Sequence, residues 1–298
     1  MANYAAKGSL FPEILVPEMV DLVRGHSALA TLSGETPIPF NGAKEFTFTL
    51  DKEIDIVAEN GAKTVGGATI TPVTIVPVKV EYGLRVSDEF KYASEEVQLD
   101  YLRTFAEGFA KKLARGLDIM AMHGVNPRTK TASTVIGTNN FDSKITNVVT
   151  EATGVTADVN MESAIALIQA NDGDVNGAAM SPSFRSALAA LTTTDGAKMY
   201  PELAWGAQPK IVNGLNVDFN STVSFNSSKD KVIVGDFANC FKWGYAKQIP
   251  LEMIEYGNPD NDSTLGDLKG HNQVYLRGEA YVGWGILDAS AFAMVKGA

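Results

Sequence analysis

The chain has 298 residues, of which 45% are hydrophobic and 20% are charged. This composition excludes a wholly disordered or collagen-like protein, because both classes have a markedly different residue usage. Its 35 acidic and 25 basic side chains give a net charge of −10, which argues against a protein that binds nucleic acid through a broad basic face.

Cys240 is the single cysteine, so no intrachain disulfide can form, as is usual in a reducing compartment. The N-terminal stretch lacks the basic patch and apolar run of a signal peptide. No uninterrupted apolar stretch reaches the roughly 18 residues that a membrane span needs. We therefore expect a soluble cytoplasmic product.

Residues 1–43 are expected to form an arm. Pro12 and Pro17 interrupt its start, and a short helical pattern follows from Val16 to Leu32. The Pro-rich stretch at 33–39 ends that pattern. The arm has few large core residues, so we expect it to pack on something outside itself.

Residues 45–86 have an alternating pattern that predicts a long β-hairpin. Phe46, Phe48, Leu50, Ile54 and Ile56 are all even-numbered, which places them on one face of a strand. The return stretch continues the alternation with Ile70, Val76, Val78, Val80, Tyr82, Leu84 and Val86. Strands from Glu45 to Val57 would reach roughly 43 Å at about 3.3 Å per residue.

A two-stranded ribbon of this length is marginal alone in water. Pro72 and Pro77 suit a ribbon in which every strand is an edge. The flexible tip is expected at residues 58–68. The apolar face needs a cover, which either the chain's own body or a neighbouring chain supplies.

Residues 94–122 are expected to form the longest helix, with Ser94 as N-cap. Gly124 and Pro127 end it. At about 1.5 Å per residue, the helix would measure roughly 44 Å. Its apolar stripe repeats at i, i+4 through Val97, Tyr101, Phe105, Phe109, Leu113, Leu117 and Ala121.

Residues 151–270 read as a compact α+β unit. Met161 to Ile168 form an amphipathic helix, and Ser181-Pro182 starts a second one. Asn213-Gly214 predicts a tight hairpin turn. Further strands are expected at 231–237, at 248–255 and within 273–296.

Catalytic, metal-binding and cofactor-binding motifs are absent from the sequence, so we expect no enzyme. Asp172 to Gly177 resembles half of a calcium loop, but the twelfth position is Ser183 instead of Glu, which favours a plain turn. His26, His123 and His271 are far apart, and a helix-end role suits His123. Cys240 beside a buried strand is expected to be a packed thiol.

The order of these parts resembles the tailed-phage major capsid proteins with the Hong Kong 97 fold. Asp118 on an apolar helix that ends at Gly124 is similar to the ending of the family's spine helix. Other stretches that carry the resemblance are Ala179–Phe184, Leu203–Gly206, Ile211–Gly214, Val232–Phe237, Val274–Ala280 and Ala291–Val295. Together they cover nearly the whole chain.

The resemblance implies an α+β fold in four parts. Residues 1–43 would be the N-terminal arm and 44–86 the extended loop that lies over a neighbouring subunit. Residues 87–150 and 271–298 would form the peripheral domain with the spine helix, and 151–270 the axial domain. The chain shows no helical scaffolding leader of the kind found in some members, which implies a separate scaffold or none.

The resemblance also implies a function by assembly. Copies of the chain would form pentamers and hexamers and then an icosahedral shell around double-stranded DNA, made in the host bacterial cytoplasm. Separate scaffolding, portal and decoration proteins are further implied partners, whereas a membrane, catalysis and covalent cross-links through Lys52, Lys63 or Lys79 are not expected. The predicted inter-subunit contacts are Phe46, Phe48, Leu50, Ile54, Ile56, Val76, Val78 and Val80.

Two alternatives remain at this point. An encapsulin-type nanocompartment would share the fold and hold cargo enzymes instead of DNA. A monomeric α+β enzyme or ligand-binding protein would protect residues 45–86 with its own body. The size of the particle would distinguish a nanocompartment from a phage capsid. The mass of the protein in solution would distinguish a monomer from an assembling subunit.

Overall fold

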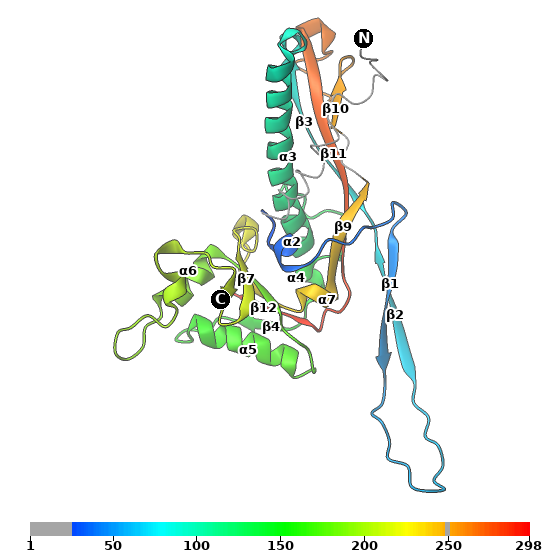
Figure 1. Cartoon of the computed structure of the whole chain (residues 1–298), viewed down its shortest axis with the longest axis vertical. Helices are drawn as coiled ribbons and strands as arrows, with labels where there is room; N and C mark the ends of the chain where they lie inside the picture. The colour runs from blue at the N-terminus through cyan, green and yellow to red at the C-terminus, as the bar shows by residue number, and fades with distance from the viewer. Residues whose placement is uncertain (1–25, 248–250) are drawn as a thin grey trace.

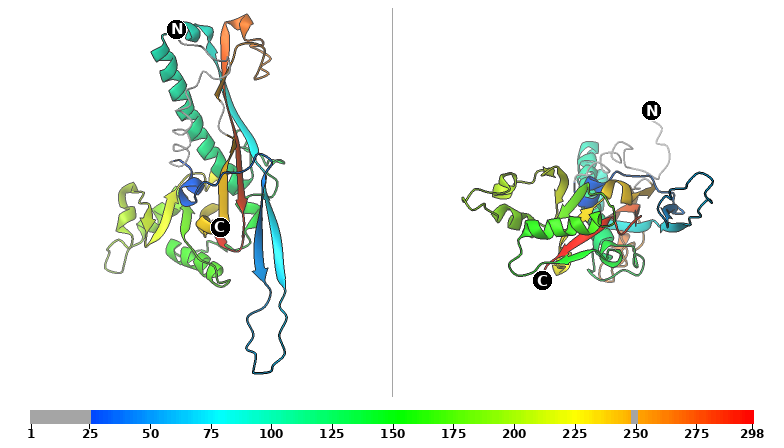
Figure 2. Two further views of the ribbon diagram at one scale, coloured as in Figure 1. Left: turned by 45° about the vertical axis from the view of Figure 1, so that its right-hand side comes forward. Right: turned by 90° about the horizontal axis from the view of Figure 1, so that it is seen from below.

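The computed structural model describes residues 26–247 and 251–298, and it has three parts (Figure 1). A long limb is built from one helix and a four-stranded sheet, and a compact part is built on a six-stranded sheet. A two-stranded ribbon projects beyond both (Figure 2). None of the helices in the described ranges is long and apolar enough to cross a membrane.

The limb sheet is antiparallel. Strand β11 (Gln273–Ile286) is central, and β3 (Val78–Ser87) pairs along one side of it in the register Ser87↔Gln273 to Val78↔Val282. On its other side β11 pairs first with β10 (Leu251–Ile254) and then with β9 (Phe241–Lys247).

Helix α3 (Glu95–His123) packs along this sheet and confirms the predicted spine helix (Figure 1). It begins after Ser94 and ends at Gly124, whose left-handed backbone (φ 67°) suits a glycine C-cap. The stripe from Phe105 to Ala121 is buried, whereas Tyr101 near the far end is 40% exposed. A 3₁₀ turn, η1 (Asp88–Tyr92), joins β3 to the helix.

The predicted hairpin is correct in its existence but wrong in its extent. Strands β1 (Ala43–Leu50) and β2 (Ala68–Ile75) pair from Ala43↔Ile75 to Leu50↔Ala68, and residues 51–67 form a tip outside the strands. The strand does not continue to Val57, because Gly61, Gly66 and Gly67 occupy the return side, where strands disfavour glycine. The rest of the return stretch, β3, belongs to the limb.

The compact part is a mixed sheet in the order β4-β12-β8-β5-β7-β6. The turn Asn213-Gly214 joins β6 to β7 with positive φ at both residues, as predicted. Helices α5 (Ala157–Gln169) and α6 (Pro182–Ala190) share one core with a face of this sheet. The strands are β4 (Val148–Thr150), β5 (Gly177–Met180), β6 (Ile211–Val212), β7 (Leu215–Phe219), β8 (Asp230–Gly235) and β12 (Phe292–Lys296).

The other face of the six-stranded sheet belongs to a second core that continues into the limb. Ile233, Phe292 and Met294 from the sheet cluster with Leu117 of α3 and Trp284 of β11. Alternate residues of β8 and β12 therefore point into different cores, as the two-residue period of a strand requires. The remaining short elements are α4 (Phe141–Lys144), α7 (Phe237–Cys240), η2 (Pro201–Gly206), η3 (Phe225–Ser227) and η4 (Lys269–His271).

The two sheets do not divide the chain at the predicted domain boundaries. Strands β9 and β10 fall within 151–270 but pair with β11 in the limb. Strand β12 falls within 271–298 but pairs with β8 in the compact sheet. The turn between β11 and β12 sends consecutive strands into different sheets, and no local sequence pattern encodes that choice.

The described end of the arm is pinned to the body. Helix α2 (Ala28–Leu32) is shorter than the predicted helix, and the part of that prediction before His26 lies outside the described residues. After α2 the chain runs beside β9, where Thr36 N–H donates to the Trp243 carbonyl at 2.8 Å and Ile38 N–H donates to the Tyr245 carbonyl at 3.3 Å.

Candidate assembly surfaces

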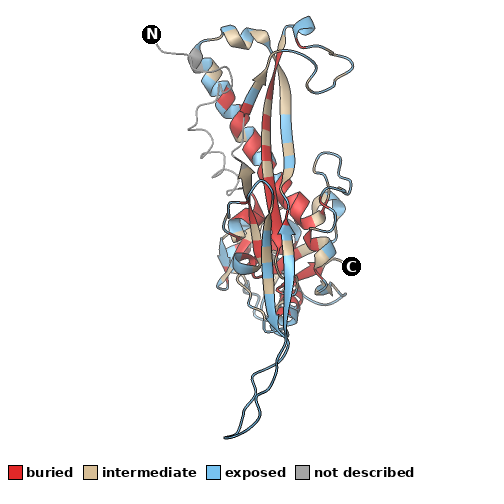
Figure 3. Ribbon diagram, turned by 90° about the vertical axis from the view of Figure 1, so that its right-hand side faces the viewer, coloured by how far each residue is buried: buried red, intermediate tan, exposed pale blue. Residues whose placement is uncertain are grey.

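The outer face of the ribbon is apolar and exposed. Figure 3 shows that most of the projecting ribbon is exposed. We define this outer face by three cross-strand pairs, Phe46↔Pro72, Phe48↔Ile70 and Leu50↔Ala68. Phe46, Phe48, Leu50 and Ile70 are 66%, 62%, 67% and 60% exposed. Opposite residues of an antiparallel pair share a face, so these side chains form one contiguous apolar strip.

The inner face of the ribbon is held by the chain's own body. Thr47 Oγ1 donates to the Leu287 carbonyl at 3.1 Å, and Glu45 forms an ion pair with Lys242 at 3.0 Å. Ile75 is buried, and it lies so close to β11 that a Cβ on Gly285 would meet its Cγ1 at 2.7 Å. The body therefore anchors the inner face of the ribbon and leaves the outer, apolar face to solvent.

The tip carries the two most exposed aliphatic side chains among the predicted contacts. Ile54 and Ile56 are each 97% exposed, beyond the last paired residue Leu50. The sides of the tip are joined at its base, where Gly67 N–H donates to Asp51 Oδ1 at 2.6 Å and Lys52 Nζ donates to the Val65 carbonyl at 3.1 Å.

Three further predicted contact residues lie outside the ribbon pairing. Val76 is 62% exposed between β2 and β3. Val78 and Val80 lie in β3 and pack partly buried against the limb core, so their place on the open face of the ribbon was predicted wrongly. The reason is that β3 pairs with β11, which turns these side chains toward the chain's own core.

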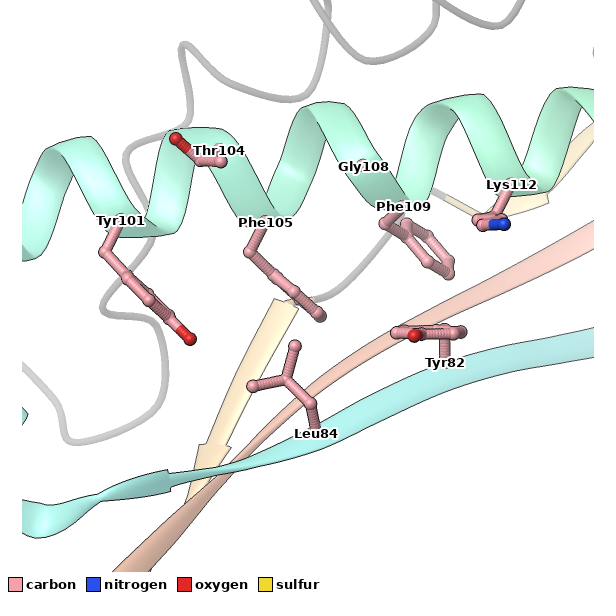
Figure 4. A pocket seen from close by; sticks show the side chains of 8 residues that line it. All are labelled: Tyr82, Leu84, Tyr101, Thr104, Phe105, Gly108, Phe109 and Lys112. Carbon is pink, nitrogen blue, oxygen red and sulfur yellow. The ribbon is translucent and has the colours of Figure 1, made fainter.

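A groove lies between α3 and β3, midway along the limb (Figure 4). This helix–strand groove has a volume of about 290 Å³. Its lining is mainly aromatic and aliphatic, with a lysine at one end, and consists of Tyr82, Leu84, Tyr101, Thr104, Phe105, Gly108, Phe109 and Lys112. Tyr82 and Tyr101 are each 40% exposed, so the groove opens to solvent.

A buried carboxylate fastens the arm to the spine helix. Asp118 of α3 is 0% exposed, and its oxygens accept from Ser27 Oγ at 2.5 Å, Ala28 N at 2.9 Å and Leu29 N at 3.2 Å. Thr222 Oγ1 donates a fourth bond at 2.9 Å. Burial raises the pKa of Asp118 to about 6, although these donors favour the charged form.

A junction cluster of four charged side chains joins the limb to the compact sheet: His123, Asp142, Asp230 and Lys296. His123 Nδ1 lies 2.8 Å from Asp142 Oδ2 and 3.4 Å from Asp230 Oδ2. Lys296 Nζ lies 3.1 Å from the other oxygen of each aspartate. Two cations thus match two anions at the point where α3 ends.

Three residues of the junction cluster, His123, Asp142 and Asp230, are of types that can bind a metal ion. In this structure the contacts of His123 are those of a protonated ring. Both ring nitrogens of His123 face acceptors, Asp142 and the Thr222 carbonyl at 2.8 Å, which requires an imidazolium. Burial acts to lower the pKa of His123, but hydrogen bonds to Asp142 and Asp230 outweigh it and raise the pKa to about 10. The four side chains thus form an ion-pair network that ties the end of α3 to the compact sheet.

The other chemical candidates have ordinary structural settings. Burial raises the pKa of Cys240 to about 11, with nearby Asp236 adding to the shift, so the thiol is not activated. Residues 172–176 form the turn between α5 and β5, as expected.

The residues that sequence reasoning missed are those of the arm and junction contacts. Asp118 interrupts the apolar run from Leu117 to Met122, and a charged residue in such a run signals a buried, hydrogen-bonded role. The pattern offers no information on its partners. The partners lie up to 104 residues away in sequence, at Thr222.

Comparisons with known proteins agree over nearly the whole chain. The model of the phage capsid family matches residues 7–297. A solved chain from Mycobacterium phage Ogopogo is 34% identical, with a TM-score of 0.76 over 92% of this chain and 92% of that chain. One from Gordonia phage Cozz is 25% identical, with a TM-score of 0.74 over 91% of this chain and 86% of that chain.

A more distant match shows the fold alone. A chain from the structure described as "Capsid of native GTA particle computed with C5 symmetry" is 13% identical, with a TM-score of 0.64 over 100% of this chain and 94% of that chain. No curated protein sequence matches the chain.

Proposed function

The chain belongs to the phage capsid family, and from this premise we propose how its copies build a shell. It is a structural major capsid protein of a phage head, located in the icosahedral capsid, and its copies assemble into capsomers. We propose that the capsomers are pentamers and hexamers in which each ribbon lies over the neighbouring subunit.

The observation that carries this proposal is the orientation of the ribbon. Its polar face, with Glu45 and Thr47, is tied to its own body, and its apolar face, with Phe46 and Phe48, is open. Burial of apolar surface contributes about 25 cal/mol per Å², so a neighbour that covers this face stabilises the assembled state. Exposed contiguous apolar strips of this kind mark interaction sites.

The geometry of the contact favours rings. A ribbon that contacts a different surface of the next copy makes a heterologous interface, and such interfaces close into rings when the rotation permits. Many repeated contacts of modest strength then hold a shell together. Phe46, Phe48, Leu50, Ile54, Ile56 and Val76 are the contact residues that this proposal retains.

The proposal includes partners other than the chain itself. The shell would enclose double-stranded DNA without binding it tightly, since the chain has a net charge of −10. Separate scaffolding, portal and decoration proteins would complete the head. Synthesis in the host bacterial cytoplasm is supported by Cys240, a free thiol that suits a reducing compartment.

The nanocompartment and monomeric alternatives are not favoured. The family model that matches residues 7–297 is that of phage capsids, which are structural proteins and not enzymes. The apolar outer face of the ribbon is also not covered by the described residues of its own chain, as it would be in a stable monomer.

The substitution Phe48→Asp tests the inter-subunit contact. We expect the subunit to fold with an unfolding free energy within about 0.5 kcal/mol of wild type, because an exposed side chain has little to lose. We expect particles to disappear from negative-stain micrographs and light scattering to report capsomers or smaller species.

The matched control is Thr49→Asp, which adds the same charge one residue further along β1. Thr49 pairs with Thr69 on the inner side of the ribbon, where the proposal places no neighbour. We expect this variant to form particles. Normal particles from Phe48→Asp would rule out the ribbon contact.

A further inference from the structure

The tip of the ribbon carries an asparagine followed by a glycine, Asn60-Gly61. We propose that this pair is a spontaneous deamidation site, which reacts in free subunits and is shielded in the shell. The shielding rests on the proposed function, because it takes the contact of the tip with a neighbouring copy as given. The reactivity rests only on the chemistry and the surroundings of the pair.

An asparagine that precedes a glycine can react with the chain's own backbone. The amide nitrogen of Gly61 attacks Cγ of Asn60, so that an N–Cγ bond forms and the Cγ–Nδ2 bond breaks. Ammonia leaves with the proton of the backbone amide, and a succinimide ring remains. Water then opens the ring at either carbonyl, which gives aspartate or isoaspartate. Glycine favours ring closure because it has no side chain in the way and leaves the backbone free to rotate.

The chain has four Asn-Gly pairs, and their surroundings differ. The pairs are Asn41-Gly42, Asn60-Gly61, Asn176-Gly177 and Asn213-Gly214. Ring closure requires the backbone of the asparagine to rotate and its side-chain amide to be free. The structure therefore decides which of the four reacts fastest.

The pair Asn176-Gly177 is fixed in both respects. Nδ2 of Asn176 donates to Asp236, and its Oδ1 accepts from Phe237 N–H at 2.9 Å. Gly177 is buried in β5 and pairs with strands on both sides. Neither the side chain nor the backbone can move without breaking the compact sheet.

Two further pairs lie where strand pairing fixes the backbone. The turn Asn213-Gly214 joins β6 to β7, which pair with each other directly beside it. The pair Asn41-Gly42 precedes β1, whose first residue Ala43 pairs with Ile75. Rotation at either asparagine would disturb these strand pairs, so we expect both to react slowly.

The pair Asn60-Gly61 has no such support. Residues 51–67 lie beyond the last strand pair, and every one of them is exposed (Figure 3). Gly61 N–H donates to the Ala58 carbonyl at 2.8 Å in a local turn. A solvent-exposed hydrogen bond outside any strand pair opens at a small cost in free energy. Opening frees the nitrogen of Gly61 for the attack.

Deamidation changes the surface that the tip presents. The stretch from Asp51 to Lys63 already carries four acidic side chains and two basic ones. Either product adds a negative charge, and isoaspartate also lengthens the backbone by one carbon. A neighbouring copy that covers the tip restricts its backbone and slows the reaction. The modification therefore marks subunits that stay unassembled.

Peptide mapping of free subunits tests the site. Wild-type subunits are kept dilute and unassembled at mildly alkaline pH, as light scattering verifies, and aspartate and isoaspartate are measured at each asparagine by mass spectrometry. We expect both to accumulate at Asn60 at least about tenfold faster than at Asn213 or Asn176. A rate at Asn60 no higher than at Asn213 would overturn the inference.

The matched variants are Asn60→Gln and Asn60→Asp. Asn60→Gln keeps the amide but needs a larger ring, so the tip peptide should gain no mass and particles should form normally. Asn60→Asp carries the charge of the product from the start, and we expect it to lower the yield of particles about threefold. Equal yields from the two variants would show that the modification does not mark the tip for assembly.

The same map of assembled particles tests the shielding. We expect deamidation at Asn60 to be at least about tenfold slower in particles than in free subunits. Equal rates would overturn the shielding. Phe48→Asp reports on the proposed function separately: if it forms normal particles, the ribbon contact fails whatever the rate at Asn60. If it blocks assembly while the two rates are equal, the ribbon contact stands and the tip is not covered.

Discussion

Ser27 and Asp118 are 91 residues apart, yet Ser27 Oγ lies 2.5 Å from Asp118 Oδ1 in a fully buried contact. The hydroxyl of Ser27 also accepts from Ala30 N–H as the N-cap of α2. The carboxylate thus completes the start of α2 with a charge that belongs to the spine helix. The position of the arm on the limb depends on this carboxylate.

Replacement of this carboxylate should weaken the subunit strongly. In Asp118→Ala the donors of Ser27, Ala28, Leu29 and Thr222 lose their acceptor inside the protein. We expect the unfolding free energy of unassembled subunits to fall by about 3 kcal/mol or more, as measured in urea. Ser27→Ala removes one donor and should cost about 1 kcal/mol. Equal losses in both variants would contradict this account.

The pH dependence of Asp118 has a definite sign. Burial raises its folded pKa to about 6 from 3.8, so the folded state holds the proton more tightly than the unfolded state. Its contribution is complete below pH 3.8 and is lost as pH rises through about 6. We expect wild type to lose stability relative to Asp118→Asn across this window in urea titrations. A difference that stays constant with pH would refute the assignment.

The junction cluster predicts a loss of stability in the same direction, with rising pH, but in a higher pH window. The folded pKa of His123 is raised from 6.5 to about 10, so its contribution is complete below pH 6.5 and is lost as pH rises through about 10. His123→Gln should cost about 3 kcal/mol at pH 7, since it removes one of the two cations of the junction cluster and leaves Lys296 alone to pair with Asp142 and the buried Asp230. The difference from wild type should vanish near the upper end of this window.

The control for this prediction is His271→Gln. His271 is exposed in the turn before β11 and lies outside the junction cluster. We expect its substitution to change the unfolding free energy by less than about 0.5 kcal/mol at any pH in the window. If His123→Gln behaves like His271→Gln, the imidazolium does not stabilise the junction.

Local sequence signals predicted the elements well. The i, i+4 apolar stripe and Gly124 predicted the spine helix and its end. Ser181-Pro182 predicted the start of a helix, and Asn213-Gly214 predicted a hairpin turn. These features depend on residues within a turn or two of each other. The ordered set of elements also indicated the capsid family, which the comparisons confirm.

The pairing of distant strands was beyond those signals. The alternating apolar pattern continues from Ile70 to Val86. It contains no signal that the pairing strand changes near Pro77, from β1 for β2 to β11 for β3. The partner of β3 lies nearly two hundred residues later, at Gln273 to Val282. For the same reason the sequence placed Asp118 near the end of the spine helix by resemblance but did not identify Ser27 or Thr222 as its hydrogen-bond donors. Contacts of this kind are set by tertiary packing, which overrides local pattern.

The arm's second attachment, beside β9, should depend on the absence of a side chain at Gly244. A Cβ at this position would lie 1.9 Å from the Thr36 carbonyl oxygen, and backbone cannot yield as a flexible side chain can. Gly244→Ala should therefore break the bonds from Thr36 and Ile38 to β9 and cost about 2–3 kcal/mol. Faster amide hydrogen exchange at Thr36 and Ile38 would report the break.

Gly116→Ala is the matched control for this substitution. Gly116 lies inside α3, and a Cβ there would meet only the Pro127 ring at 3.8 Å, an ordinary contact. Because alanine is the better helix former, we expect a gain of about 0.8–1 kcal/mol in the unfolding free energy. Should Gly244→Ala leave exchange at Thr36 and stability unchanged, the arm would not require this close approach to β9.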